Sequence, residues 1–90
     1  MNDTVARHVV AVVGGGAAGA TTAALLKSAQ PDLDIAIVEP SEHHYYQPAW
    51  TLVGGGAYDV ARTRRRTADC LPAGVTWIRD RVDAFAPEQN

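Results

Sequence analysis

A run of β-branched and small apolar residues that leads straight into spaced glycines constrains the fold of this chain most strongly. Residues 9–13 read Val-Val-Ala-Val-Val, which is typical of a buried strand, and Gly14 follows at once. With Gly16 and Gly19 this gives the spacing Gly-x-Gly-x-x-Gly. In that spacing the first glycine permits a tight turn, the second lets the backbone approach a pyrophosphate, and the third lets a helix pack close to the strand. Because helix N-termini favour negative charge, the motif predicts a strand, turn and helix that bind a dinucleotide.

A second apolar run ends in an acidic residue. Residues 35–38 read Ile-Ala-Ile-Val and Glu39 follows them, about 20 residues after Gly19, where an acid can accept hydrogen bonds from an adenosine ribose. Residues 17–29 between the two runs are rich in alanine and leucine and favour a helix, and Pro31 marks the loop after it. The sequence therefore predicts an α/β fold, a Rossmann-like FAD/NAD(P)-binding βαβ unit with a parallel sheet.

The rest of the chain gives weaker signals. They predict, in order, a loop over 40–48, a short helix over 49–53 that starts at Pro48, a glycine stop at 54–56, a loop over 57–67 with at most one helical turn, a turn near 68–71, and strands over 75–78 and 82–85.

Length and composition limit the possible functions. The 90 residues hold one domain at most, and a net charge of −2 gives no sign of nucleic-acid binding. The single cysteine, Cys70, excludes an internal disulfide and an internal dithiol pair, and we expect no metal site. No signal peptide or membrane-spanning run is visible, so we expect a protein on the cytoplasmic side, soluble or peripheral to a membrane.

Two longer segments carry a resemblance. Residues 39–54 read Glu-Pro-Ser-Glu-His-His-Tyr-Tyr-Gln-Pro-Ala-Trp-Thr-Leu-Val-Gly, and residues 71–78 read Leu-Pro-Ala-Gly-Val-Thr-Trp-Ile. Together with the glycine motif they resemble the N-terminal part of the sulfide:quinone oxidoreductases, which are FAD-dependent members of the pyridine nucleotide-disulfide oxidoreductase family. The resemblance covers His8 to Phe85, and its Tyr-Tyr-Gln-Pro-x-Trp-Thr-Leu-Val-Gly stretch is far more specific than the glycines.

The resemblance implies FAD as the cofactor. It implies a reaction in which two electrons pass from sulfide through FAD to a membrane quinone. It also implies that the redox cysteines, a second FAD motif and the membrane-contacting parts lie beyond Asn90, and a homo-oligomer is possible. Residues 1–90 are then the N-terminal part of an FAD-binding domain, truncated at its C-terminal side, without catalytic residues and inactive alone. The implied cofactor-binding residues are Gly14, Gly16, Ala17, Ala18, Gly19 and Glu39, with Gln47 and Pro48 toward the flavin and Val82 beside the adenine.

Two other functions stay open. The same glycines and Glu39 permit an NAD(P)H-dependent dehydrogenase or an NADH:quinone oxidoreductase domain, although a nicotinamide domain has no need of the loop at residues 45–48. The other alternative is a non-catalytic, truncated nucleotide-binding fragment whose sheet edge is left unpaired and favours association with another chain.

For several further residues we predict a structural or solvated role rather than a functional one. We read Cys70 as a small buried hydrophobe, and His43 and His44 as solvated loop residues rather than cofactor contacts. The arginines at 62 and 64–66 form a basic cluster that we expect to be solvated, rather than to face phosphate, lipid or a partner.

Overall fold

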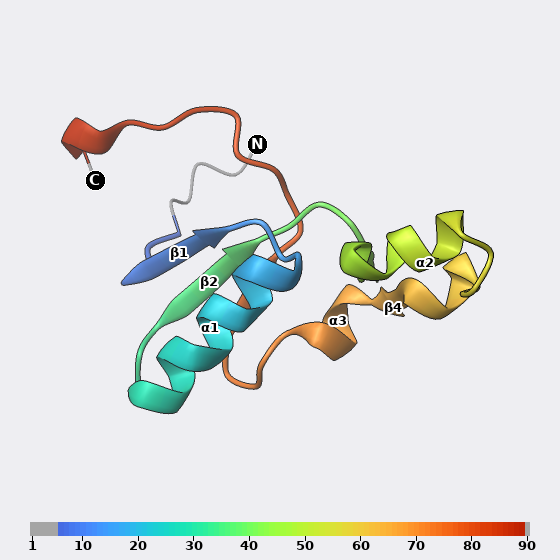
Figure 1. Cartoon of the computed structure of the whole chain (residues 1–90). Helices are drawn as coiled ribbons and strands as arrows, with labels where there is room; N and C mark the ends of the chain where they lie inside the picture. Colours follow the sequence, from blue (N-terminus) through green and yellow to red (C-terminus); the bar gives the residue numbers. More distant parts are fainter. Residues whose placement is uncertain (1–5, 90) are drawn as a thin grey trace.

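The computed structural model describes residues 6–89. The expectation of no signal peptide rests in part on residues 1–5, which lie outside the described residues. Its centre is a parallel sheet in the order β1-β2-β5, formed by β1 (Val10–Val13), β2 (Ile35–Val38) and β5 (Thr76–Ile78). Helix α1 (Ala17–Ala29) connects β1 to β2 and lies against one face of the sheet (Figure 1). The predicted α/β fold with a Rossmann-like βαβ unit is confirmed.

The core lies between α1 and the central strand β2. Ile35 and Ile37 point to the same face of β2, since alternate residues of a strand share a face. Both are fully buried there and pack against Ala23 of α1. Ala36, on the other face of β2, is buried as well. Pairing of Val12 with Ile37 sets the register of β1 against β2. This small core brings the end of β1 and the end of β2 to the same edge of the sheet.

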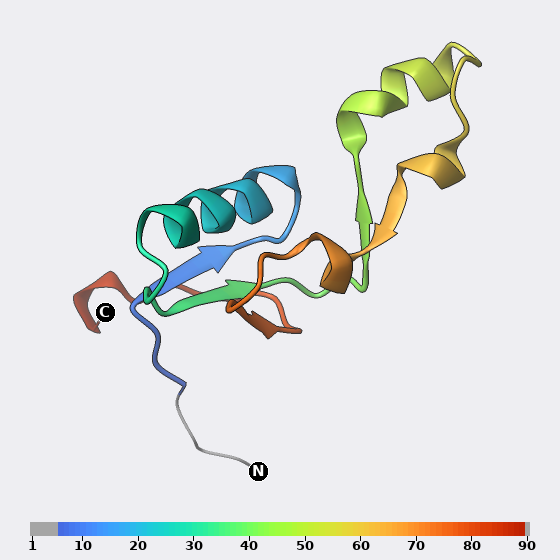
Figure 2. The same ribbon diagram turned by 90° about the horizontal axis from the view of Figure 1, so that it is seen from below.

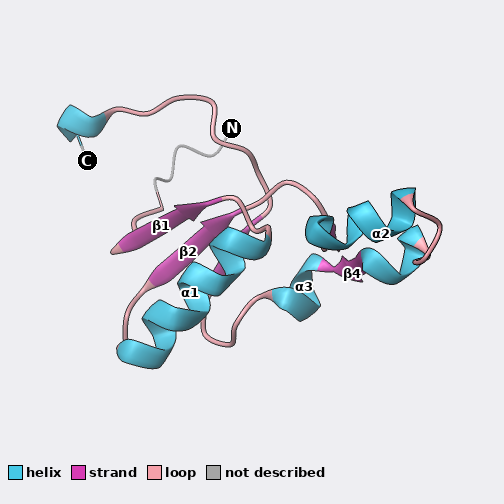
Figure 3. Ribbon diagram, viewed as in Figure 1, coloured by secondary structure: helices cyan, strands magenta, loops and turns pink. Residues whose placement is uncertain are grey.

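Between β2 and β5 the chain leaves the sheet and returns. Strands β3 (His43–Tyr45) and β4 (Arg64–Arg66) pair antiparallel, and they carry η1 (Gln47–Ala49), α2 (Trp50–Gly54) and η2 (Val60–Thr63). We call residues 43–66 the excursion. Figure 2 shows that it extends away from the sheet, and Figure 3 shows its mixture of short helices and strands. The short helix α3 (Thr67–Cys70) then leads back toward β5, and η3 (Pro87–Gln89) lies near the C-terminus.

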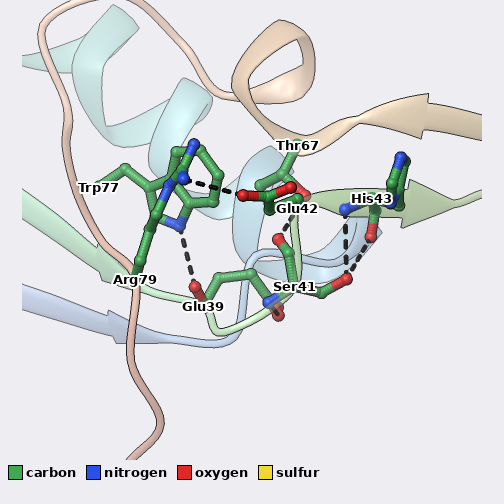
Figure 4. Close-up of polar contacts among 7 residues, drawn as sticks. All are labelled: Glu39, Ser41, Glu42, His43, Thr67, Trp77 and Arg79. Carbon is green, nitrogen blue, oxygen red and sulfur yellow. Dashed lines mark hydrogen bonds and ion pairs between the residues drawn. The ribbon is translucent and has the colours of Figure 1, made fainter.

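Polar contacts fasten the base of the excursion to the sheet (Figure 4). The buried Thr67 hydroxyl donates to the Ser41 carbonyl oxygen at 2.8 Å. Nearby, the Trp77 indole N–H donates to the carbonyl oxygen of Glu39 at 2.9 Å, which ties β5 to the end of β2. The Arg79 guanidinium lies over the Trp77 ring, 4.3 Å from its centroid. The start and the end of the excursion are therefore held at the same edge as the glycine turn.

Several of the expected elements are observed where the sequence placed them. Helix 17–29 and strand 35–38 have the predicted bounds, and the predicted strand at 75–78 is observed as Thr76–Ile78. The expected loops over 40–48 and 57–67 are wrong in part, because they contain β3 and β4. Each of these strands is too short to be evident alone, and each exists through pairing with the other.

The predicted strand at residues 82–85 is wrong, because the described chain has no strand there. The Asp80 N–H donates to the Ile78 carbonyl oxygen and the Arg81 N–H to the Asp80 carboxylate, which turns the chain directly after β5. Phe85 is 74% exposed. The apolar character of this segment suggested a strand, but residues 82–85 pair with none of the described strands. Among residues 6–89, no helix combines the length and apolar character needed to cross a membrane.

Candidate dinucleotide-binding site

The turn between β1 and α1 depends on the backbone freedom of Gly14. This residue has φ +96°, in the left-handed region that glycine adopts without strain. Its N–H donates to the carbonyl oxygen of Val38 at 2.9 Å, so the turn starts as a continuation of the pairing between β1 and β2. The chain then enters α1 through Gly16, the N-cap residue. The N-terminus of α1 therefore lies at the edge of the sheet where β1 and β2 end.

The third glycine of the motif sets the distance between α1 and β1. A Cβ at Gly19 would overlap the carbonyl oxygen of Gly14, and it would lie 3.3 Å from the Val12 Cγ1 atom. The close packing of helix on strand therefore requires glycine at this position. Gly15, to which the sequence reasoning gave no role, is also confined: it is buried, and its Cβ would lie 3.0 Å from Glu39 Cβ. The unbroken Gly14–Gly16 run was the available signal for it.

The N-terminus of α1 is open to a ligand. Gly16 has no side chain to cap the helix, and the first turn contains no acidic residue. The first N–H groups of a helix have no partner within the helix, and the helix dipole makes this end favourable for negative charge. A Cβ at Gly16 would meet nothing within 4 Å, so the backbone here faces free space. These features fit a phosphate or pyrophosphate group.

A cavity of about 370 Å³ lies at this helix start, and we call it the glycine-loop cavity. The excursion contributes one of its walls through Tyr45 and η1. Seven of the nine residues predicted to bind the cofactor line it, namely Gly14, Gly16, Ala17, Ala18, Gly19, Gln47 and Pro48. The fold therefore brings together two segments that lie some 30 residues apart in the sequence.

Glu39 lies in an adjoining cavity of about 200 Å³, which shares Gly16, Tyr45 and Gln47 with the first. The side chain is held by backbone donors: Oε1 accepts from the Gly15 N–H at 2.8 Å and Oε2 from the Ser41 N–H at 2.9 Å. Because a carboxylate has about four acceptor positions, both oxygens keep capacity for a further donor. The predicted ribose acceptor is thus oriented in advance by the glycine turn.

Val82 is the predicted site residue that the structure does not bring to this place. It is half-buried in the irregular segment after β5, and it lines neither the glycine-loop cavity nor the cavity at Glu39. The strand that was expected to place it against an adenine is not formed. His44 shows the opposite outcome. It is half-buried, with Nδ1 3.3 Å from the Gly15 carbonyl oxygen, so it is not the solvated residue expected from the sequence.

The remaining candidates divide in a similar way. Cys70 is half-buried rather than buried. Arg66 of the basic cluster forms an ion pair with Asp69 at 2.9 Å, and this contact lowers the pKa of the Asp69 carboxyl. Arg62 lies over the Tyr58 ring, 4.6 Å from its centroid. In the part of the chain that the structure describes, no three histidine, cysteine or acidic side chains come together as a possible metal site.

The parallel βαβ unit and the glycine turn place the chain in the Rossmann-like class of α/β proteins. Comparison with known proteins narrows this class. No protein-family model matches the chain. Over 81 residues, however, it is 49% identical to the mitochondrial sulfide:quinone oxidoreductase of Mus musculus, a match that covers 90% of this chain and 18% of that protein.

Two further relatives have the same name. The mitochondrial sulfide:quinone oxidoreductase of Dictyostelium discoideum is 54% identical over 57 residues, and that of Schizosaccharomyces pombe is 41% identical over 58 residues. Each match covers 63% of this chain and 13% of the relative. The chain thus spans less than a fifth of the length of these relatives. These matches support a sulfide:quinone oxidoreductase-like family for the chain, and they confirm the resemblance inferred from the sequence.

Proposed function

We propose that residues 1–90 form the N-terminal part of the FAD-binding domain of a flavoprotein oxidoreductase, most closely of the sulfide:quinone oxidoreductase type. The observation that carries the proposal is the uncapped start of α1, where Gly16 opens into a cavity that Gln47 and Pro48 also line. A simple anion site needs only the helix start. The wall contributed by the excursion supports a larger ligand that extends beyond its phosphates.

The residues of the two cavities have distinct parts in this proposal. The N–H groups at Gly16, Ala17 and Ala18 bind the pyrophosphate, since they lie at the positive end of the helix dipole. Glu39 accepts a hydrogen bond from the adenosine ribose with an oxygen that Gly15 already orients. Gln47 lies toward the flavin end. FAD, when bound, supplies two-electron transfer, whereas this chain binds and orients it.

A contact between Val82 and the adenine stays a prediction. It requires residues 80–85 to adopt a different path from the turn that the Asp80 N–H and the Ile78 carbonyl oxygen form here. If FAD contacts this segment, hydrogen exchange at Val82 should slow when FAD is added.

The complete reaction belongs to a longer parent protein in this proposal. Sulfide oxidation that forms and breaks a protein disulfide needs two cysteines, and Cys70 is the single cysteine of the 90 residues. Sulfide and a membrane quinone are the proposed substrates, on the basis of what the relatives are named for. Peripheral membrane contact from the cytoplasmic side and a homo-oligomeric state are proposed for the parent protein as well. The 90 residues alone are expected to bind FAD weakly, and sub-micromolar affinity would contradict that expectation.

The test compares FAD with NADH as ligands of the parent protein by fluorescence titration. We expect a preference for FAD and a loss of about tenfold or more in FAD affinity for Gly16→Ala, because a methyl group enters the space through which the pyrophosphate approaches. Gly54→Ala is the matched control, since its Cβ also meets nothing within 4 Å but lies at the end of α2. A preference for NADH alone would support the dehydrogenase alternative. If Gly16→Ala and Gly54→Ala bind FAD with equal affinity, the glycine turn does not contribute to FAD binding.

A further inference from the structure

Another cavity lies between the excursion and Cys70 of α3, and it shares no lining residue with the glycine-loop cavity. It has a volume of about 460 Å³, and we call it the arginine cavity. The side chains that matter for its chemistry are Arg62, Arg65, His44, Tyr46, Tyr58 and Cys70. Nothing in the proposed binding of FAD uses it.

The charge of this cavity has one sign. Two guanidinium groups line it, and no carboxylate does. Within residues 6–89, three arginines form ion pairs with carboxylates, namely Arg66, Arg79 and Arg81. Arg62 and Arg65 form no such pair in this range. An arginine presents a planar fork of N–H donors that matches carboxylate and phosphate oxygens. The cavity therefore offers positive charge and directed donors that the described chain leaves unpaired.

The strand pairing explains why one arginine of the β4 run faces this cavity. Arg65 pairs with His44 across β3 and β4, and both residues line the arginine cavity. Arg64 pairs with Tyr45, and Tyr45 lines the glycine-loop cavity instead. Because successive residues of a strand point to opposite faces, Arg65 lies on the cavity side and Arg64 on the other side.

The walls of the cavity are held together by hydrogen bonds and aromatic contacts. The buried Thr63 hydroxyl accepts from the Trp50 indole N–H at 3.2 Å and donates to the Val60 carbonyl oxygen at 2.7 Å. The Tyr46 N–H donates to the Thr63 carbonyl oxygen at 2.8 Å. The Arg62 guanidinium is positioned by its contact with the Tyr58 ring. Two tyrosines and a positioned guanidinium thus give the cavity flat surfaces beside its charge.

We propose that the arginine cavity binds a small organic anion composed of an aromatic ring and a phosphate or carboxylate group. Arg62 and Arg65 bind the oxyanion, and Tyr46 and Tyr58 contact the ring. His44 lies at the boundary, because it lines this cavity and also the one at Glu39. The ligand would therefore be separated by His44 from the carboxylate of Glu39.

The chain contains its own reporter for this site. Cys70 is the only cysteine of the 90 residues, and it lines the cavity. Because the parent protein is expected to carry further cysteines, we would measure in that protein the rate at which a neutral maleimide alkylates Cys70 itself, by mass spectrometry of the peptide that contains it. The ionic strength and pH are kept constant, and phenyl phosphate, benzoate or benzyl alcohol is present. A bound anion should slow alkylation by about tenfold at a concentration about ten times its dissociation constant. Phenyl phosphate and benzoate distinguish the two oxyanions, and benzyl alcohol supplies the ring without charge.

Matched variants separate cavity binding from general charge. The double variant Arg62→Gln/Arg65→Gln should lose the protection, whereas Arg64→Gln, in the same strand, should keep it. Each variant is compared with and without ligand, so a changed intrinsic reactivity of Cys70 cancels, and circular dichroism checks the fold. The proposal is overturned if neither anion protects Cys70, if benzyl alcohol protects it equally, or if the double variant is still protected. FAD titration of the same variants is independent, since neither arginine lines the glycine-loop cavity.

Discussion

At Gly19 the structure leaves no room for a side chain, whereas at Gly16 it leaves open space. Gly19→Ala should lower the free energy of unfolding by about 1–3 kcal/mol, because the added methyl group overlaps the Gly14 carbonyl oxygen and forces α1 away from β1. Gly16→Ala should cost less than about 1 kcal/mol, since only the preference of the N-cap changes. Urea denaturation followed by circular dichroism measures both. Similar losses for the two variants would contradict this account of the motif.

His8 and Asp34 give the chain a contact that responds to acid. The His8 Nδ1 atom lies 3.0 Å from an Asp34 carboxylate oxygen, and this hydrogen bond lowers the pKa of Asp34 below the ordinary 3.8. A carboxyl group whose pKa is lower in the folded state stabilises the fold above its unfolded-state pKa, and that contribution is lost as the pH falls through the folded value. Wild-type stability should therefore fall below about pH 4.

The matched variant for this contact is Asp34→Asn, which removes the titrating group and keeps its size. Thermal unfolding measured from pH 6 to pH 2.5 should show a smaller acid loss for the variant than for the wild type. Because the carboxylate is exposed, the difference should be small. Parallel pH profiles for the two proteins would show that the contact with His8 contributes nothing to acid stability.

The excursion depends as an element on how its base is fastened. Thr67 is 1% exposed, and its hydroxyl donates to the Ser41 carbonyl oxygen. Thr67→Val keeps the shape and removes the donor, so the free energy of unfolding should fall by about 1–3 kcal/mol. Thr22→Val is the control, because the exposed Thr22 hydroxyl makes a similar bond to a carbonyl oxygen within α1. Hydrogen exchange at β3 and β4 should rise for Thr67→Val alone, and equal exchange in both variants would contradict the prediction.

The pairing of β3 with β4 has a second consequence at the scale of elements. It divides the side chains of the hairpin between two cavities, with Tyr45 in one and Arg65 in the other. A shift of this register by one residue would exchange the two faces. The arginine cavity and the wall of the glycine-loop cavity therefore depend on the same strand pairing.

As a whole molecule the chain is extended and has little core. Its radius of gyration is 15.4 Å, compared with about 12 Å for a compact domain of this length, because the excursion projects from the sheet. Ile37→Ala should cost about 2–5 kcal/mol, since Ile37 is fully buried between the sheet and α1. That loss is comparable with the total stability of many domains. Thermal unfolding should lose its cooperative transition.

The control for this variant is Leu25→Ala. Leu25 lies on the outer side of α1 and is 66% exposed, so its truncation removes little buried surface. Its unfolding transition should stay close to that of the wild type. If Ile37→Ala and Leu25→Ala have the same thermal unfolding transition, the packing of β2 against α1 is not the main source of stability.

Sequence reasoning predicted the sheet unit and its site best where the signals are local. The apolar runs, the alanine-rich helix and the glycine spacing each act over a few residues, and β1, α1 and β2 lie where those patterns indicate. The contact of Gly15 with Glu39 was not predicted, since it joins residues 24 positions apart. The prediction of a strand at Val82 was wrong for a similar reason, because a strand also depends on pairing with a distant segment.

The sequence by itself determined the βαβ unit, the glycine turn at Gly14 and the acidic residue at the end of β2, because backbone preference and side-chain period act locally. Only the tertiary structure decided that β3 pairs with β4, that Tyr45 forms part of the glycine-loop cavity, and that two arginines line a separate cavity. These arrangements come from hydrogen bonds and packing between segments that are distant in the sequence. No pattern within either segment alone specifies its partner.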